Sequence, residues 1–178
     1  MISLHIFDKK LKMEWRSYVF QSLLAVLALI AILYFLNILT QAAIVAALGA
    51  STFIIFAMPN STTAQPRNII GGHVMGLIAG SICALAFVAL PQLSPAVEKF
   101  CYIFAAALSV GLAIFLMAIT DTEHPPAAGT ALGIVAFGPT LAWSFGWPFW
   151  RVVLFVLIFA VTLSLVRYLF RPWLKELV

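Results

Sequence analysis

The sequence predicts an all-α, polytopic integral membrane protein, in which a bundle of helices lies within a lipid bilayer. Of the 178 residues, 64% are hydrophobic and only 9% are charged, whereas soluble domains carry about 25% charged residues. The apolar residues also gather into runs that approach the roughly 20 residues needed to cross the hydrocarbon core. Because a surface so poor in charge is unsuited to water, the chain is expected to be integral to a membrane.

The basic residues predict how the chain is oriented. We expect a transmembrane domain over residues 18–170, flanked by basic stretches at residues 1–17 and 171–178. Basic flanks mark the cytoplasmic side, so both termini are predicted to be cytoplasmic and the number of crossings to be even. The opening residues lack the pattern of a cleavable signal peptide, and the expected location is the inner cell membrane. The net charge of +4 then reflects topology, and no nucleic-acid partner is expected.

Six apolar segments, separated by polar or proline-containing connections, are expected to form the helices. The first is long enough to span a bilayer, whereas the second and fifth are short and rich in small residues. Asn68 is expected to cap the third segment by accepting a hydrogen bond from its first free amides. The six segments cover residues 18–39, 41–58, 68–90, 100–120, 126–137 and 152–170.

Two topologies fit these segments. If the second and fifth cross fully, the chain has six spans; if they are re-entrant, it has four full transmembrane helices plus two short ones. Both numbers are even, so the basic termini do not distinguish them.

A faint internal repeat links the two short segments. Residues 48–55, LGASTFII, and residues 127–134, AAGTALGI, share a core of two small residues and a hydroxyl. Two halves of three segments suggest a 3+3 inverted repeat, with functional sites at the short, interrupted segments. Small residues also match by chance in membrane helices, so the repeat stays open. The matched cores are Gly49-Ala50-Ser51 and Ala128-Gly129-Thr130.

Glycines at every fourth position predict close helix packing. Gly72, Gly76 and Gly80 follow this spacing in the third segment, and Gly129 and Gly133 follow it in the fifth. In a bilayer, helices associate where small residues let their backbones approach. We therefore expect a compact bundle, and the same faces could join copies of the chain in a homo-oligomer.

The stretch DTEHPPAAGT, residues 121–130, places carboxylates, a histidine and two prolines between long apolar runs. Polar groups at membrane depth are costly and often functional. Pro125 and Pro126 have backbone angles preset near helical values and lack amide hydrogens, so they suit a first helical turn. His124 is then expected at the N-cap or beside it, at the mouth of the short fifth helix.

An anion is the ligand that this helix start is expected to bind, because a helix N-terminus carries partial positive charge and free donors. The alternative is a capped helix start at the membrane surface, with its carboxylates merely solvated. The predicted anion contacts are His124 with the amides of Ala127 and Ala128, and Ser51 with Thr130 along the path.

Further polar residues are expected near this site. Asp121 and Glu123 are predicted to orient His124 or to gate access by repulsion. Arg67 is the better candidate for anion contact in its segment, because the paired N–H donors of its guanidinium match the geometry of a small oxyanion. Asn68 is a candidate polar lining. His73 has two interpretations: a polar residue that lines the site, or a packed histidine that joins helices. The second is preferred.

Three motifs identify a resemblance to a known family. GAST, AQPRNIIGGH and HPPAAGTAL occur in order along the chain, and they resemble the HPP family of integral membrane proteins, named after the His-Pro-Pro at residues 124–126. The resemblance covers residues 41–170. It implies a transmembrane region of four helices, which favours the re-entrant topology. Members of that family are implicated in nitrite transport, so the resemblance implies nitrite or a similar small anion.

The expected function is therefore a transporter or channel for a small monovalent anion, nitrite above all. One alternative is a membrane subunit whose glycine faces bind partner helices. Another is a membrane-embedded enzyme, but no nucleophile and base motif accompanies the histidine and carboxylates. The two cysteines have no histidine at ligand spacing, so neither a metal nor another cofactor is expected.

Overall fold

A computed structural model of the chain describes residues 11–36, 42–88, 94–136 and 147–177. Over those ranges the chain forms six α-helices and one 3-10 turn, and no strand. The predicted all-helical fold with six apolar helices is confirmed. The helices are α1 (Leu11–Leu36), α2 (Ala42–Ala57), α3 (Pro66–Val88), α4 (Pro95–Thr120), α5 (Pro126–Ala136) and α7 (Trp147–Phe170), and the 3-10 turn η1 is Thr62–Ala64.

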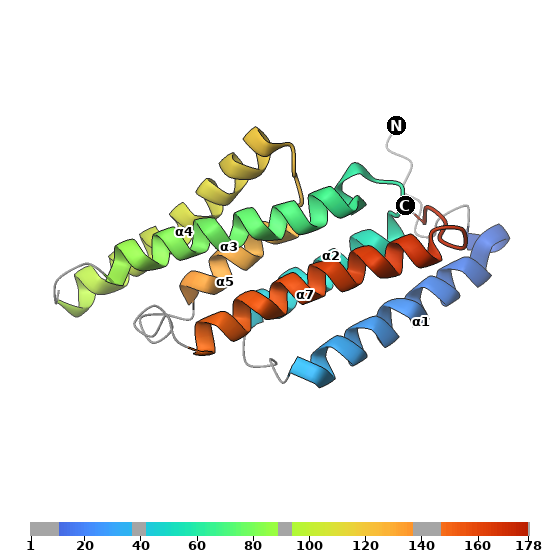
Figure 1. Cartoon of the computed structure of the whole chain (residues 1–178), viewed down its shortest axis with the longest axis horizontal. Coiled ribbons are helices and arrows are strands. Elements are labelled where there is room, and N and C mark those ends of the chain that lie inside the picture. Colours follow the sequence, from blue (N-terminus) through green and yellow to red (C-terminus); the bar gives the residue numbers. More distant parts are fainter. Residues whose placement is uncertain (1–10, 37–41, 89–93, 137–146, 178) are drawn as a thin grey trace, which may run out of the picture.

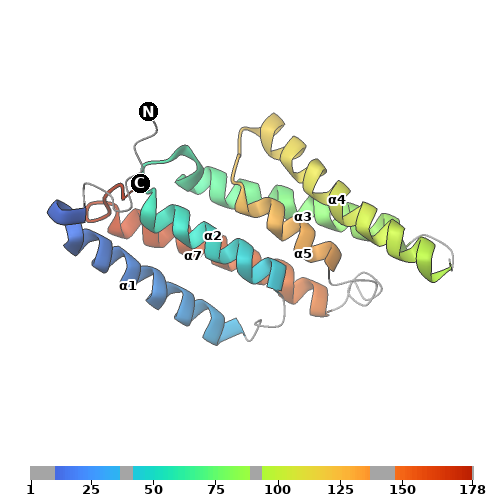
Figure 2. The ribbon, with the colours of Figure 1, turned by 180° about the vertical axis from the view of Figure 1, so that it is seen from behind.

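Successive helices run in alternating directions, so every second connection lies at the same end of the bundle (Figure 1). Helices α3 and α7 form one layer and α2 and α5 form the other, while α1 and α4 lie at the two outer edges (Figures 1 and 2). The connection before α3 and the connection before α5 therefore approach each other at one end. This arrangement brings the conspicuous polar stretches of the sequence together.

The helices differ in length. Within the described residues, α3, α4 and α7 are long and apolar enough to cross a membrane. Helix α2 has 16 residues and α5 has 11, too few to cross a hydrocarbon core of about 30 Å at about 1.5 Å per residue. The two segments expected to be short are short. Four full spans and the inverted repeat stay predictions.

Three helices begin with a proline: Pro66 in α3, Pro95 in α4 and Pro126 in α5. Proline suits the first helical position, where its missing amide hydrogen would have no partner within the helix. The prediction that Asn68 caps α3 is wrong for this reason, because the helix already begins at Pro66. The amides of Asn68 and Ile69 instead donate to the carbonyl of Gln65, at 2.9 and 3.0 Å.

The regularly spaced glycines lie inside the bundle. A Cβ atom added at Gly80 would lie 2.7 Å from the carbonyl oxygen of Ala131, and one added at Gly76 would overlap the carbonyl of Ala127, so α3 meets the backbone of α5. On the opposite side of α5, Gly129 and Gly133 face α2. These faces are thus occupied within one chain. The homo-oligomer stays a prediction, but these glycines do not supply its interface.

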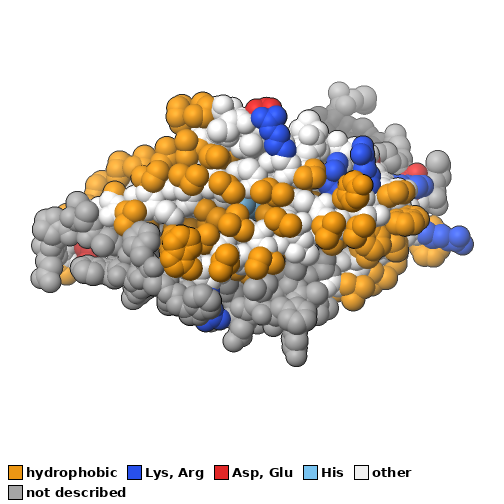
Figure 3. All heavy atoms as spheres, viewed as in Figure 1, with side chains coloured by type: hydrophobic (Ala, Val, Ile, Leu, Met, Phe, Trp, Pro, Cys, Tyr) orange, Lys and Arg blue, Asp and Glu red, His pale blue; other side chains and the backbone are white. Residues whose placement is uncertain are grey.

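The outer surface is apolar. Hydrophobic side chains cover most of the described surface in Figure 3, and lysines and arginines gather mainly toward its right-hand end. Helix α4 buries only a stripe at every fourth position, from Ala105 to Met117, and exposes large apolar side chains on its other faces. Such a surface suits lipid, as expected for an integral membrane protein. The exposed residues of α4 include Val97, Phe100, Ile103, Phe104, Leu108, Ile114, Phe115 and Ile119.

The segment after α7 folds back onto the bundle. The buried Gln21 amide nitrogen donates to the carbonyls of Phe56 and Lys175, and its oxygen accepts from the Lys175 amide at 3.1 Å. Arg167 donates to the Pro59 carbonyl at 2.7 and 3.1 Å. These contacts fix the end of the bundle at which the connection before α3 lies.

Candidate functional site

Four polar residues meet in the middle of the bundle. Ser51 of α2, His73 of α3, His124 in the connection before α5, and Thr130 of α5 are each fully buried, with 0% of their surface exposed. We call this group the histidine–hydroxyl network. Four buried polar side chains from separate segments are costly unless they satisfy each other.

The Ser51 hydroxyl is the centre of the network. Its Oγ lies 2.8 Å from Nε2 of His124 and 3.1 Å from Nε2 of His73, so one hydroxyl bridges two imidazoles. The network continues at both ends: Nδ1 of His73 lies 2.9 Å from Oγ1 of Thr130, and Nδ1 of His124 lies 2.8 Å from the carbonyl oxygen of Thr63 in η1. Every ring nitrogen of the pair therefore has a partner.

The two imidazole rings also contact each other directly. Their centroids are 5.2 Å apart and the rings are inclined at 61°. The His73 ring also contacts the ring of Phe159 in α7 in a T-shaped arrangement, with the ring centroids 6.4 Å apart. The network is thus enclosed by α2, α3, α5 and α7, and this enclosure explains its complete burial.

Local sequence holds His124 in place. A Cβ atom added at Gly72 would lie 2.6 Å from Cβ of His124, so only glycine lets the histidine pack this closely on α3. After His124, Pro126 begins α5 as predicted. The amide of Ala127 donates to the carbonyl of His124 at 2.9 Å, and the amide of Ala128 donates to Pro125 at 3.1 Å. The two amides expected to contact an anion are therefore already hydrogen-bonded.

His124 is neutral at physiological pH. Burial lowers its pKa from 6.5 to about 4, and the hydrogen bond to the Thr63 carbonyl acts in the opposite direction without offsetting this. Within the described ranges, no group of three or more His, Cys, Asp or Glu side chains is placed to hold a metal ion.

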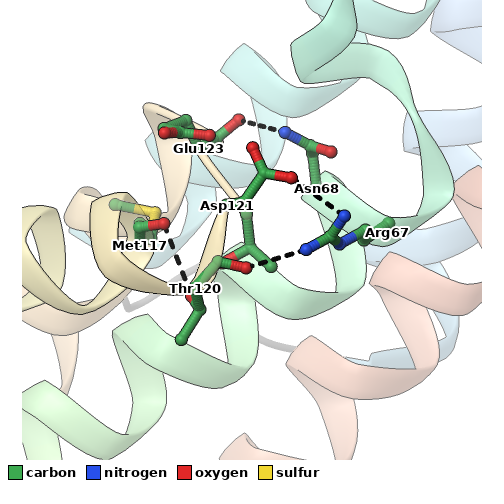
Figure 4. A network of polar contacts seen from close by, with 7 residues as sticks. Arg67, Asn68, Met117, Thr120, Asp121 and Glu123 are labelled. Atoms are coloured by element: carbon green, nitrogen blue, oxygen red, sulfur yellow. Dashed lines mark hydrogen bonds and ion pairs between the residues drawn. The ribbon is translucent and has the colours of Figure 1, made fainter.

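A second set of polar contacts lies nearby and centres on an exposed ion pair, with the buried Asn68 beside it (Figure 4). Arg67 in the first turn of α3 forms an ion pair of 2.9 Å with Asp121 and donates to the Thr120 carbonyl at 3.0 Å. Asn68 donates to the backbone carbonyl of Glu123 at 3.0 Å. Asp121 adopts left-handed backbone angles that end α4. We call this set the Arg67 latch, because it fastens residues 120–123 to the start of α3.

The structure brings together most of the residues proposed from the sequence, but not all. Ser51, Thr130 and His124 meet in one network. His73, expected mainly as a packing residue, joins it. Arg67 and Asn68 lie outside the network and hold the segment that carries His124.

Two expectations about orientation are corrected. The group that orients His124 through Nδ1 is the Thr63 carbonyl, and neither Asp121 nor Glu123 takes that position. Asp121 pairs with Arg67 instead. Sequence patterns did not reveal Thr63, because a backbone carbonyl has no residue signature.

Comparisons with known proteins agree with the membrane character of the chain. A transmembrane protein of Dictyostelium discoideum is 37% identical over 100 residues, which cover 56% of this chain and 32% of that protein. A second transmembrane protein of the same organism is 40% identical over 84 residues, covering 47% of this chain and 24% of that protein. The chain thus matches a third or less of the length of these relatives. No solved structure matches it.

A family profile gives the wider assignment. The profile of the family described as "HPP, transmembrane region" matches residues 10–173, which is most of the chain. The resemblance predicted from the three sequence motifs is confirmed, and the chain belongs to the HPP transmembrane family.

Proposed function

We propose that this protein is a membrane transporter or channel for a small monovalent anion, with nitrite as the first candidate. The observation that carries the proposal is the histidine–hydroxyl network, in which two imidazoles and two hydroxyls lie fully buried in a bundle of apolar helices. Ionisable groups at membrane depth mark ion and substrate pathways. In this proposal the protein lies in the inner cell membrane with both termini cytoplasmic.

The Arg67 latch is the proposed entry point. The side chains of Arg67 and Asp121 are 63% and 77% exposed, and an exposed ion pair contributes only about 0–1 kcal/mol. Arg67 can therefore exchange Asp121 for an anion at low cost. Its guanidinium offers the paired donors that a small oxyanion prefers.

His124 is the proposed contact deeper in the protein. It directly follows Glu123, whose carbonyl is held by Asn68 of α3. Because the network is enclosed in this structure, an anion reaches His124 only when residues 120–123 separate from the start of α3. Release of the Arg67 latch is thus the proposed opening step, with Ser51 and Thr130 along the path beyond it.

The experiment is nitrite uptake into liposomes that contain only this protein, with chloride and nitrate as competitors. His124→Ala is the test variant. Thr52→Ala is the matched control, because Thr52 is also a buried hydroxyl residue of α2 but donates to the Leu48 carbonyl of its own helix. We expect saturable nitrite uptake that His124→Ala lowers about 100-fold, which corresponds to roughly 2.7 kcal/mol, and that Thr52→Ala retains.

Two results would contradict the proposal. Undiminished uptake by folded His124→Ala protein would remove the assigned role of the histidine. Absence of uptake for all three anions by folded wild-type protein would favour the partner-binding subunit, and purification from its native membrane would then be expected to retain a fixed partner.

A further inference from the structure

The hydrogen atoms of the histidine–hydroxyl network can be assigned from one fixed point. The Thr63 carbonyl, 2.8 Å from Nδ1 of His124, can only accept a hydrogen bond. Nδ1 of His124 must therefore carry a hydrogen. Since a neutral imidazole carries one hydrogen on its two nitrogens, Nε2 of neutral His124 is an acceptor.

The rest of the network follows from that assignment. The Ser51 hydroxyl must donate to Nε2 of His124, because a buried acceptor without a donor is costly. Ser51 then has only its lone pairs to offer Nε2 of His73, so His73 carries its hydrogen on Nε2 and accepts at Nδ1 from Thr130. The two histidines are opposite tautomers. Every hydrogen bond points the same way, from Thr130 to Thr63.

Ser51 has a second acceptor in reach. Its Oγ also lies 3.1 Å from the carbonyl oxygen of Ala47, one turn earlier in α2. If His124 gains a proton on Nε2, the Ser51 hydroxyl can rotate to donate to Ala47. Its two lone pairs then accept from Nε2 of both histidines. Rotation of one hydroxyl therefore leaves every polar group satisfied in the neutral network and in the network with one added proton.

The directed chain also gives a path for that proton. A proton that binds Oγ1 of Thr130 displaces the Thr130 hydroxyl hydrogen to Nδ1 of His73. The Nε2 hydrogen of His73 passes to Ser51, and the Ser51 hydrogen passes to Nε2 of His124. Thr130, His73 and Ser51 each gain one hydrogen and give up one, whereas His124 only gains one and carries the single positive charge. His73 then holds its hydrogen on Nδ1, facing Thr130, and accepts at Nε2 from Ser51. This end state differs from the rotated one only in the His73 tautomer and the directions of the Ser51 and Thr130 hydroxyls.

Among the residues that the structure describes, no buried carboxylate lies beside the protonated network. Helices α2 and α5 carry no charged residue, and the charged groups of the other helices packed around the pair lie near helix ends. A buried cation is unfavourable unless it is paired. An incoming anion would supply the missing charge. The charged groups in question are Arg67 on α3, Asp121 and Glu123 before α5, Glu98 and Lys99 on α4, and Arg151 and Arg167 on α7.

We infer that the histidine–hydroxyl network binds one proton together with the anion, so that each anion crosses with one H⁺. This inference rests on the proposed anion transport for its transport step, while the tautomers and the single-proton site stand on the network alone. Ser51 is the residue that lets the site switch between its two states. Proton-coupled movement makes the transported pair neutral and removes the cost of carrying an unpaired charge through the bundle.

The proton site is tested without transport by nitrogen NMR of protein labelled with ¹⁵N-histidine. The chain has only three histidines, so the spectrum is simple, and protonated and unprotonated ring nitrogens give well separated signals. We expect one buried histidine with hydrogen on Nδ1 and the other with hydrogen on Nε2. Ser51→Ala should abolish this fixed pair of tautomers and Thr52→Ala should keep it. The same tautomer in both buried histidines would overturn the assignment.

The coupling is tested in liposomes that enclose a pH-sensitive dye. We expect added nitrite to acidify the lumen by one proton per anion, above the passive entry of nitrous acid measured in protein-free liposomes. Ser51→Ala should lower the coupled flux about tenfold or more, the scale of one lost charge-assisted hydrogen bond, and Thr52→Ala should not. Nitrite uptake without proton movement would overturn the coupling and leave anion transport standing. No uptake at all would instead overturn the proposed function and, with it, the coupled transport.

Discussion

Two sets of polar contacts join the same two segments, and their central contacts differ in charge and in exposure to solvent. The Arg67 latch and the histidine–hydroxyl network both connect the first half of α3 to residues 120–130. In the latch, the paired side chains of Arg67 and Asp121 are 63% and 77% exposed. In the network, His73 and His124 are completely buried. Water can replace the ion pair of the latch, whereas it reaches no side chain of the network.

The difference indicates which contacts can break when residues 120–123 separate from α3, and which contacts stabilise the packed helices. An exposed ion pair contributes about 0–1 kcal/mol because water and salt screen it. A buried polar group that loses its partner costs about 1–3 kcal/mol. The ion pair between Arg67 and Asp121 is therefore easily released, whereas separating the network leaves buried groups without partners.

The largest loss of stability is expected where α3 packs directly against the backbone of α5. Gly76→Ala would place a methyl group against the backbone carbonyl of Ala127, which cannot move without displacing α5. We expect a loss of stability of about 3 kcal/mol, the upper part of the usual range for overpacking. Thermal unfolding in detergent, followed by circular dichroism, measures it. Gly111→Ala is the matched control, since no atom lies within 4 Å of its added Cβ. Equal stability of the two variants would contradict the close contact of α3 and α5.

The next largest loss of stability is expected when the His73 imidazole is removed from the network. His73→Leu leaves the Thr130 hydroxyl without its imidazole partner and removes one of the two imidazoles bonded to Ser51, and we expect it to destabilise the protein by about 2–3 kcal/mol. Adding Thr130→Val should recover part of this loss, because it removes one of the orphaned groups. A double-mutant cycle on unfolding free energies measures the coupling. Strictly additive losses would show that His73 and Thr130 do not interact.

The sequence predicted those features of the fold that depend on composition and local backbone geometry, namely the helices and some of their starts. Apolar runs indicated the helices, and Pro126 begins α5 as expected, because the restricted backbone of proline acts locally. Helix α4 begins at Pro95, earlier than the expected residue 100. Helix α3 began earlier than expected, since Pro66 was assigned to the preceding connection. Local rules were sufficient here, and the error was one of boundary.

The contacts within the site were less predictable. Ser51 and Thr130 were linked by the internal repeat, and His124 by its position before α5. The bond from His124 to the Thr63 carbonyl depends on how η1 folds over the bundle, and no residue type signals it. Glycine spacing indicated close packing but did not say which helix each face would meet. Tertiary partners of this kind depend on the whole topology.

Low pH should destabilise the folded protein through the buried His124. The pKa of His124 is lowered from 6.5 to about 4, so an unfolded chain binds a proton at this residue before the folded protein does. The contribution of His124 to stability is complete above pH 6.5 and is lost as the pH falls toward 4. We expect a loss of about 2 kcal/mol by pH 5. Unfolding measured against pH should show a shallower dependence in His124→Gln. An identical dependence in both proteins would contradict a neutral, buried histidine.

The smallest effect on stability is expected at the exposed latch. Asp121→Asn removes the charge but keeps a residue that tolerates the left-handed backbone angles at this position, so it isolates the ion pair from the turn. Stability should change by less than about 1 kcal/mol, and the change should disappear at high salt because the pair is screened. Nitrite uptake should not fall, since Arg67 is freed from its internal partner, whereas Arg67→Gln should weaken nitrite binding. A loss above about 2 kcal/mol in Asp121→Asn, independent of salt, would mean that the latch holds the segment as firmly as the network does, and that opening must then occur elsewhere.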